Sequence, residues 1–269
     1  MRAEPCDHTF VICAYGESPY LEECILSLKK QSVRTNIRMA ASTDNGHIRG
    51  LAEKYRIPLD INGGPGGITQ DWNFGLSRAK TPLVTIAHQD DVYCRDYAAE
   101  ILRRARAAKR PLIIFTDYGE LRNGRRVNNN RLLKIKRLML MPLEIPGLSG
   151  SRFLRRRILS LGNPISCPSV TYAMEYLPHP LFQDGYTCVE DWQAWERISR
   201  FKGQFCYVKK LLMYHRIHRQ STTSGMIEGS GRAGEDLQMF ERFWPAPVAR
   251  LLGRFYSASE SSNHLGEDK

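Results

Sequence analysis

Two adjacent carboxylates, Asp90 and Asp91, follow the apolar and β-branched segment Val84–Ala87, separated from it by His88 and Gln89. A continuous apolar run of this kind is typical of a strand that is buried on both faces of a parallel sheet. Ligands of open α/β sheets bind beyond the carboxyl ends of such strands. We therefore expect Asp90 and Asp91 to hold a hard divalent cation together with the phosphates of a substrate. The alternative is an acidic turn that caps the helix beginning near Asp96.

A second carboxylate pair, Glu190 and Asp191, opens a predicted helix that carries Trp192, Trp195 and Ile198 on one side. In a chemical role, Asp191 would be a general base that removes a proton from an acceptor hydroxyl. The helix dipole also stabilises anions in a first turn, so good helix design explains the pair equally well. The same dipole would weaken Asp191 as a base, and both interpretations stay open.

His218 lies in the late segment His215–Thr222 and suits a metal ligand or a hydrogen-bond donor to phosphate. A surface histidine without such a role is the alternative. The glycine-rich loop Asn62–Gly67 matches neither common phosphate-binding motif, because Thr69 stands where the dinucleotide fingerprint needs glycine or alanine, and the chain has no Gly-Lys-Ser/Thr. The sequence therefore disfavours a nicotinamide cofactor and P-loop ATP chemistry.

The elements that must position these residues alternate between strand and helix, which predicts parallel βαβ units and a Rossmann-like first half. A helix is expected to begin at Ser18-Pro19, and Asn123-Gly124 predicts a hairpin turn. A glycine-rich linker is expected from Ser224. The predicted strands are 9–14, 36–41, 57–61, 84–87, 111–121, 170–174, 204–208 and 211–216. The later predicted helices are 94–108, pieces of 131–161, a helix opening at 190, and two short amphipathic helices at 235–243 and 248–256.

The net charge is +11, and much of the excess lies between Arg103 and Arg157. Such a patch favours a polyanion, an anionic membrane surface or a phosphorylated substrate, although solvated helix faces explain any single cluster equally well. The seven cysteines are scattered and form no Cys-x-x-Cys, which indicates reduced thiols and a cytoplasmic protein. The polar start of the chain does not resemble a signal peptide, and no apolar run approaches the length of a membrane span.

Three separated signals occur in an order that resembles family-2 glycosyltransferases of the GT-A fold. Ala14-Tyr15-Gly16-Glu17 follows the first strand, Gln89-Asp90-Asp91 follows the fourth, and Glu190-Asp191-Trp192 is succeeded by the segment Tyr214–His218. The resemblance covers roughly residues 9–223. It implies an α/β fold with a mostly parallel Rossmann-like sheet flanked by helices, a small antiparallel acceptor-side region and a C-terminal helical tail. The expected domains are 1–223, divided into a nucleotide-sugar-binding half (1–93) and an acceptor-side half (94–223), and a helical extension (224–269).

The resemblance also implies a role for each candidate residue. Asp191 matches the catalytic base, with Glu190 beside it. The metal ligands would be Asp90, Asp91 and His218, for Mn²⁺ or Mg²⁺. The nucleotide sugar would contact Ala14, Tyr15, Glu17, Ser42, Asp71, Gln89 and Asp90. This chain departs from the family pattern at three places. The stretch after the second strand, where the family usually has an acidic residue, has Ser42 as the possible substitute. His88 or Gln89 replaces the first aspartate of the Asp-x-Asp motif, and Asp71-Trp72-Asn73 replaces Arg-Asn.

The implied activity is metal-dependent transfer, with inversion, of a hexosyl or related group from a nucleotide-diphosphate sugar to a hydroxyl. The expected acceptor is a glycan or lipid-linked glycan in bacterial-type surface polysaccharide synthesis, with peripheral contact at the inner face of a membrane. Two other classes are a nucleotidyltransferase acting on sugar phosphates and a non-catalytic polyanion binder. The arginines show no aromatic interleaving, so nucleic acid is not expected as a partner. An inactive relative of the family is a further alternative.

Overall fold

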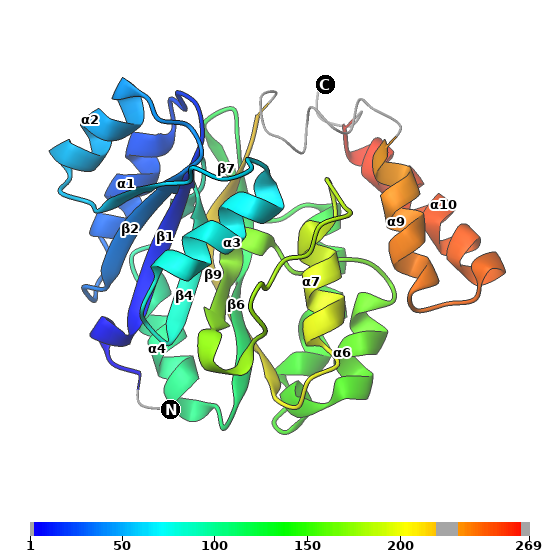
Figure 1. Ribbon diagram of the computed structural model, residues 1–269. Helices are drawn as coiled ribbons and strands as arrows, with labels where there is room; N and C mark the ends of the chain where they lie inside the picture. The colour runs from blue at the N-terminus through cyan, green and yellow to red at the C-terminus, as the bar shows by residue number, and fades with distance from the viewer. Residues whose placement is uncertain (1–2, 219–230, 265–269) are drawn as a thin grey trace.

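A nine-stranded mixed sheet forms the centre of the molecule (Figure 1). The computed structural model describes residues 3–218 and 231–264. The strand order is β3-β2-β1-β4-β8-β6-β9-β5, and β7 pairs with β6. The strands are β1 (His8–Ala14), β2 (Asn36–Ala41), β3 (Leu59–Ile61), β4 (Leu83–His88), β5 (Val92–Tyr93), β6 (Pro111–Arg122), β7 (Arg125–Val127), β8 (Val170–Ala173) and β9 (Gln204–Ile217).

The first half of the sheet is parallel, as the βαβ pattern predicts. β1 pairs in parallel with β2 and with β4, and β2 with β3. The second half is mixed, because β8 runs antiparallel between β4 and β6, whereas β6 and β9 are parallel. The mixed α/β architecture with an antiparallel region in the second half is therefore confirmed.

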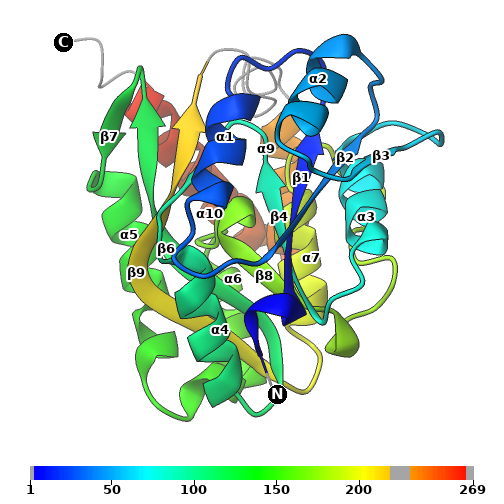
Figure 2. The same ribbon diagram turned by 90° about the vertical axis from the view of Figure 1, so that its left-hand side faces the viewer.

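Helices cover both faces of the sheet, so the molecule has three layers (Figures 1 and 2). α1, α2 and α4 pack on one face through Leu21, Ile48 and Ile101, in one core cluster with Phe10 of β1. α3, α6 and α7 pack on the other face, where Val11 of β1 belongs to a second cluster. The helices are α1 (Leu21–Lys29), α2 (Gly46–Lys54), α3 (Ile68–Arg78), α4 (Tyr97–Ala107), α5 (Arg131–Leu140), α6 (Arg152–Leu159), α7 (Glu190–Ile198), α9 (Gly231–Glu241) and α10 (Ala246–His264).

Two predicted boundaries are wrong for identifiable reasons. α1 begins at Leu21 rather than at Ser18-Pro19, because residues 18–20 form a turn in which the Tyr20 amide donates to Ser18 Oγ at 3.3 Å. The two strands predicted at 204–208 and 211–216 are one strand, β9. Its pairing with β6 continues past Lys209 and Lys210 through a register irregularity. The Asn123-Gly124 turn is confirmed, since both residues have positive φ between β6 and β7.

The C-terminal helices belong to the second core cluster. The helix expected at 248–256 lies within the longer α10, whereas the one expected at 235–243 corresponds to α9, which begins earlier, at Gly231 in the predicted linker, and ends earlier, at Glu241. Met239, Phe240 and Ala249 are buried in the cluster that contains Trp192. The linker expected from Ser224 lies, up to residue 230, outside the described residues. Within 3–218 and 231–264, no helix combines the length and the apolar character needed to cross a bilayer.

Candidate active site

The parallel register brings the ends of β1, β2 and β4 to one edge of the sheet. Ala14 pairs with Ala41 at the ends of β1 and β2, and Cys13 pairs with His88 at the end of β4. The residues after these strands therefore meet, although they are separated by up to about seventy positions in the chain. Ala14, predicted to contact a nucleotide, is 3% exposed and closes β1 at this edge.

The backbone after β1 is held by the side chain of Gln89. The Tyr15 amide donates to Gln89 Oε1 at 3.0 Å, and Gln89 Nε2 donates to the Tyr15 carbonyl at 3.1 Å. The Gly16 amide donates to Thr43 Oγ1 at 2.7 Å. These contacts fix the loop while the Tyr15 side chain stays 64% exposed and Glu17 is exposed beside it. Gln89 thus lies in the predicted site, with its amide engaged by the protein backbone.

A carboxylate from α3 reaches the end of β2. Ser42 Oγ donates to Asp71 Oδ2 at 2.7 Å, and Asn62 Nδ2 donates to Asp71 Oδ1 at 3.1 Å. The family pattern places an acidic residue after the second strand, where this chain has Ser42. Asp71 supplies a carboxylate at that same position from a helix about thirty residues later in the chain.

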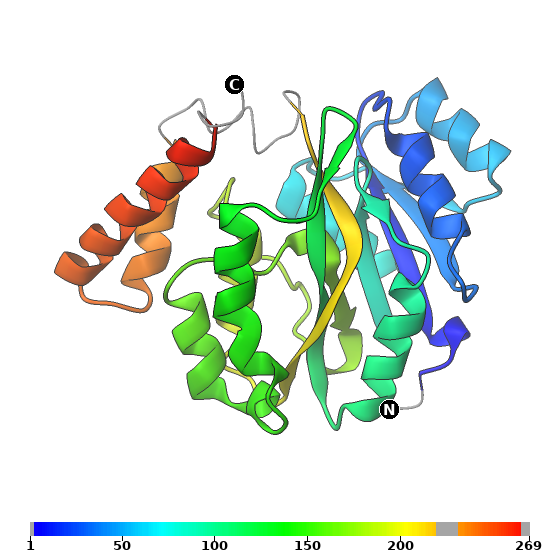
Figure 3. The same ribbon diagram turned by 180° about the vertical axis from the view of Figure 1, so that it is seen from behind.

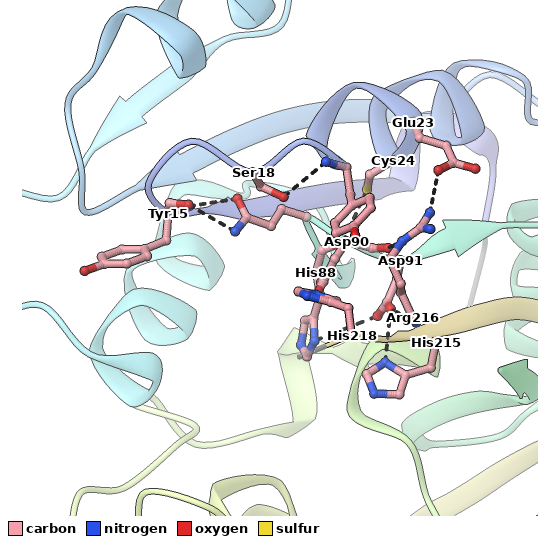
Figure 4. Close-up of polar contacts among 12 residues, drawn as sticks. Tyr15, Ser18, Glu23, Cys24, His88, Asp90, Asp91, His215, Arg216 and His218 are labelled. Carbon is pink, nitrogen blue, oxygen red and sulfur yellow. Dashed lines mark hydrogen bonds and ion pairs between the residues drawn. The ribbon is translucent and has the colours of Figure 1, made fainter. Parts of the chain in front are cut away.

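Asp90 and His218 form a hydrogen-bonded pair at the mouth of the site (Figure 4). His218 Nε2 and Asp90 Oδ2 are 2.9 Å apart, and both side chains are about one-fifth exposed. Burial alone would raise the pKa of Asp90, but the His218 hydrogen bond and the nearby His88 and His215 bring it below its usual value. Asp90 is therefore ionised at neutral pH and open to solvent on one side.

Asp91 points into the protein rather than toward solvent (Figure 4). Its side chain is fully buried, and Oδ1 accepts hydrogen bonds from the Arg216 amide at 2.8 Å and from His215 Nδ1 at 3.0 Å. Oδ2 is buried and has no hydrogen-bond partner among the described residues. Burial lowers the pKa of His215, but the Asp91 charge and hydrogen bond outweigh it and raise the pKa to about 9.

Arg216 connects three segments around Asp90. Its Nε donates to the Asp90 carbonyl at 2.7 Å, and its guanidinium forms an ion pair with Glu23 of α1. The guanidinium also lies over the Tyr20 ring at 4.3 Å. Because the Tyr20 ring contacts the His218 ring at 5.0 Å between centroids, α1, the β4 end and the β9 end are held together.

His88 lies next to Asp91, with 3.9 Å between His88 Nδ1 and Asp91 Oδ2, and it is also influenced by the charges of Asp90 and Asp191. Burial lowers its pKa, and the charges of Asp91, Asp90 and Asp191 oppose that shift. Its ring stacks on Trp72 of α3 with centroids 5.3 Å apart. The charges of Asp90 and Asp191 therefore both act on the pKa of His88, although the two aspartates lie about a hundred residues apart in the chain.

Asp191 is held at the first turn of α7. Asn163 Nδ2 donates to Asp191 Oδ2 at 2.9 Å, and the Trp192 amide donates to Oδ1 at 2.7 Å. Burial raises the pKa of Asp191, more than these two hydrogen bonds lower it. Burial also raises the pKa of neighbouring Glu190 to about 7. The net shift in the pKa of Asp191 is upward, so burial outweighs the groups that stabilise the anion. A raised pKa makes a carboxylate a stronger base than an exposed aspartate.

A pocket of about 500 Å³ lies between α3 and the loop that contains Phe182 and Asp184. Its wall includes Asn62, which contacts Asp71, and Phe182, which packs on Trp72 with centroids 4.8 Å apart. Thr69 Oγ1 is buried in the pocket wall and has no partner among the described residues. The pocket wall therefore combines apolar and hydrogen-bonding side chains and lies beside Asp71.

Sequence reasoning missed three residues that organise the site: Trp72, Asn163 and Arg216. Asn163 opens a proline-containing loop, which gave no reason to pair it with Asp191. Arg216 lies between His215 and His218 in the sequence, and the predicted function of that segment rested on His218 alone. Trp72 is predicted to lie on a helix with Leu76 and Ala79, but no local pattern indicates that its ring stacks on His88.

The residues present fit a divalent cation in donor type. Asp90 offers a carboxylate oxygen and His218 an imidazole nitrogen, which are donors that Mn²⁺ accepts. The unpartnered Oδ2 of Asp91 is a buried acceptor without a donor among the described residues. In the described part of the chain, however, no three His, Cys, Asp or Glu side chains are grouped closely enough to form a metal site by themselves. A cation would therefore need further oxygen ligands from its substrate.

Comparison with known structures places this fold among GT-A glycosyltransferases. TarS residues 1–349 from S. aureus, in complex with UDP-GlcNAc, is 16% identical with a TM-score of 0.61, over 88% of this chain and 71% of that chain. The mannosyltransferase PcManGT from Pyrobaculum calidifontis, in complex with GDP-Man and Mn²⁺, is 14% identical with a TM-score of 0.62, over 94% and 72%. Another TarS structure is 15% identical with a TM-score of 0.56, and this chain covers only 42% of it.

The family model described as "Glycosyl transferase family 2" matches residues 9–161, which is more than half of the chain. The protein belongs to glycosyl transferase family 2. No curated protein sequence matches the chain. Family membership supports a glycosyl transfer function and agrees with the resemblance drawn from the Asp90 and Asp191 motifs.

Proposed function

We propose that this protein transfers a hexosyl or related group, with inversion, from a nucleotide-diphosphate sugar to a hydroxyl of a glycan or lipid-linked glycan. The observation that carries the proposal is that Asp90, held by His218, and Asp191, held by Asn163, both act electrostatically on the same side chain, His88. Donor-side and acceptor-side groups must lie near one another if one displacement is to join their substrates. Complexes of the neighbouring structures with UDP-GlcNAc and GDP-Man support a nucleotide sugar as the donor class.

The donor would lie along the ends of β1, β2 and β4. The exposed Tyr15 ring offers a surface on which a base can stack, with Ala14 and Glu17 beside it. Ser42 and Asp71 offer a hydroxyl and a carboxylate to the base or ribose, and Gln89 keeps the Tyr15 backbone in place. The diphosphate would then extend toward Asp90.

The acceptor hydroxyl would lie against Asp191, which removes its proton as the oxygen attacks the anomeric carbon. Asn163 orients the Asp191 carboxylate, and the raised pKa strengthens it as a base. Glu190, beside it in the first turn of α7, would contact the acceptor. The bond from the anomeric carbon to the diphosphate breaks on the opposite side, which inverts the configuration.

A divalent cation, Mn²⁺ or Mg²⁺, would be held by Asp90 and His218, with Asp91 Oδ2 as the third predicted ligand. When bound, such an ion offsets the negative charge on the leaving diphosphate. Asp90→Ala should therefore abolish the Mn²⁺-dependent part of donor binding, measured by calorimetry with UDP-GlcNAc and GDP-Man. Equal donor affinity of wild-type protein with Mn²⁺ and with chelator would refute the metal role.

The product identifies the reaction class. Nucleotide sugars that stabilise the protein in a thermal-shift panel should release a nucleoside diphosphate when an acceptor glycan is added. Release of pyrophosphate from a sugar phosphate and a nucleoside triphosphate would instead establish a nucleotidyltransferase. Absence of any thermal shift with every nucleotide sugar, with and without Mn²⁺, would indicate an inactive relative.

A further inference from the structure

Large exposed apolar side chains are concentrated on two segments of the molecule. Of the twelve among the described residues, ten lie either within residues 135–161 or on α10, and only Tyr15 and Leu26 lie elsewhere. Phe153 of α6 is 73% exposed, and Phe255 of α10 is 68% exposed. Single exposed apolar residues are ordinary, but such a concentration marks an interaction surface.

The two segments adjoin at the end of the molecule opposite α1 and α2 (Figures 1 and 3). Trp244, just before α10, donates from Nε1 to the Ser160 carbonyl at 2.8 Å. The Arg157 guanidinium lies over the Trp244 ring at 4.8 Å. Arg157 also lies over the Phe153 ring at 5.5 Å. We call α6, Leu161 and α10 together the apolar–basic face, because these contacts join α6 to the start of α10.

Basic side chains are interleaved with the apolar ones on this face. Arg152 is exposed next to Phe153, and Arg250 and Arg254 are exposed on either side of Leu251 and before Phe255. Val248, Leu251 and Phe255 follow the spacing i, i+3, i+7, which forms one stripe along α10. Long arginine stems can lie along apolar surface while their guanidinium groups reach anions at its boundary.

This chemistry matches an anionic lipid surface better than a second copy of the chain. Exposed Phe and Leu enter the boundary between headgroups and acyl chains, and flanking arginines pair with lipid phosphates. A second copy docked by the same face would oppose two surfaces that both carry the exposed Arg152, Arg250 and Arg254, and such like charges repel.

We propose that the apolar–basic face docks this protein peripherally on a bilayer that contains anionic phospholipid. The proposal goes beyond the transfer reaction and does not depend on it. It gives the uneven charge and the C-terminal helices one shared role, which is to hold the molecule at the surface where a lipid-linked acceptor would be found.

Co-sedimentation with vesicles tests the proposal. The 269-residue chain should pellet with equimolar phosphatidylcholine and phosphatidylglycerol, should not pellet with phosphatidylcholine alone, and should be released by high salt. Arg254→Glu and Arg152→Glu should each weaken binding at least about fivefold, or about 1 kcal/mol, since each basic residue near an anionic surface contributes on that order. Phe255→Asp and Phe153→Asp should weaken binding as well, because each removes an exposed apolar side chain and adds a charge of the same sign as the lipid.

The matched controls lie on α1, at the other end of the molecule. Leu26→Asp and Lys29→Glu change an exposed leucine and an exposed lysine, and both should bind vesicles like wild type. Circular dichroism must first establish that each variant is folded. If Phe255→Asp is not folded, Phe255→Ser is tested in its place. Donor hydrolysis in solution should be equal in all variants.

Three results would overturn the proposal. They are no binding of wild-type protein to the anionic vesicles, equal loss of binding in the α1 controls, and a concentration-dependent dimer in sedimentation velocity that Phe255→Asp dissociates. The third result would identify the face as a self-association surface. A protein that binds vesicles yet turns over no nucleotide sugar would contradict the proposed function alone.

Discussion

At the scale of single residues, Asp191 shows how position and burial act in opposite directions. It lies in the first turn of α7, where the helix dipole stabilises the anion, and two hydrogen bonds do the same. Burial nevertheless raises its pKa above the ordinary value. A carboxylate whose pKa is raised in this way accepts a proton more readily than an exposed one.

Asp191→Asn should lower kcat by about 10²–10⁴-fold, because it removes the proposed proton acceptor. The asparagine keeps one oxygen, which can accept the Asn163 hydrogen bond, and loses the acceptor of the Trp192 amide within α7. Both contacts lie away from the proposed donor contacts, so donor affinity should be unchanged. Steady-state kinetics and donor calorimetry measure the two quantities. Glu53→Gln, an exposed carboxylate on α2, is the control. Loss of donor affinity together with kcat would mean that Asp191 is structural.

Glu190 predicts a pH-dependent stability. Burial raises its pKa from 4.5 to about 7, so the folded state holds a proton that the unfolded state has released. The free energy of unfolding should therefore fall as pH rises from about 4.5 to 7 and stay lower above that range. Glu190→Gln should lack this decrease and gain up to about 3 kcal/mol on wild type across that window. Urea unfolding at pH 4.5, 6 and 8 measures the difference, and a constant difference would contradict the shift.

At the scale of elements, the position of α7 depends on a buried guanidinium from α6. Arg155 is fully buried, and it donates to the carbonyls of Ser199, Phe201 and Gly203 just beyond the end of α7. Its guanidinium also lies over the Phe205 ring at 4.9 Å. Three backbone acceptors are thereby satisfied by one planar group, which a lysine cannot replace because its ammonium lacks the planar fork.

Arg155→Lys should lower the free energy of unfolding by about 2–4 kcal/mol, since at least two buried carbonyls would lose their donors. Arg152→Lys, one turn earlier and exposed, should change it by less than about 0.5 kcal/mol. Chemical denaturation of both variants gives the comparison. Equal effects of the two substitutions would show that the three carbonyl contacts do not position α7.

At the scale of the whole molecule, the C-terminal helices complete the core behind the proposed base. Phe240 of α9 is 1% exposed and meets the Trp192 ring edge-on, with centroids 5.1 Å apart. Trp192 directly follows Asp191, so α9 packs behind the helix that carries the base. The apolar–basic face and the active site are consequently parts of one packed body.

Phe240→Ala should lower the free energy of unfolding by about 3–5 kcal/mol, because it leaves a cavity beside Trp192. Phe255→Ala, on the exposed stripe of α10, should change it by less than about 0.5 kcal/mol. Urea denaturation followed by tryptophan fluorescence measures both variants. A small effect of Phe240→Ala would mean that α9 contributes little to the core.

The sequence alone determined the features that depend on local pattern. The apolar run before Asp90 predicted β4, Asn36–Ala41 predicted β2 to the residue, and Asn123-Gly124 predicted the β6–β7 turn. Local geometry is set by backbone preference and by the periodicity of apolar residues, both of which are readable from neighbouring positions. Motif order was likewise sufficient to indicate the family.

Only the tertiary structure decided which distant side chains meet. The pairing of Ser42 with Asp71, the contact of Asn163 with Asp191 and the inward orientation of Asp91 depend on strand register and helix packing across long stretches of chain. Burial, which sets the pKa of Asp191, is likewise a property of the assembled core. No local pattern encodes these distances, because they arise from packing between segments that are remote in the sequence.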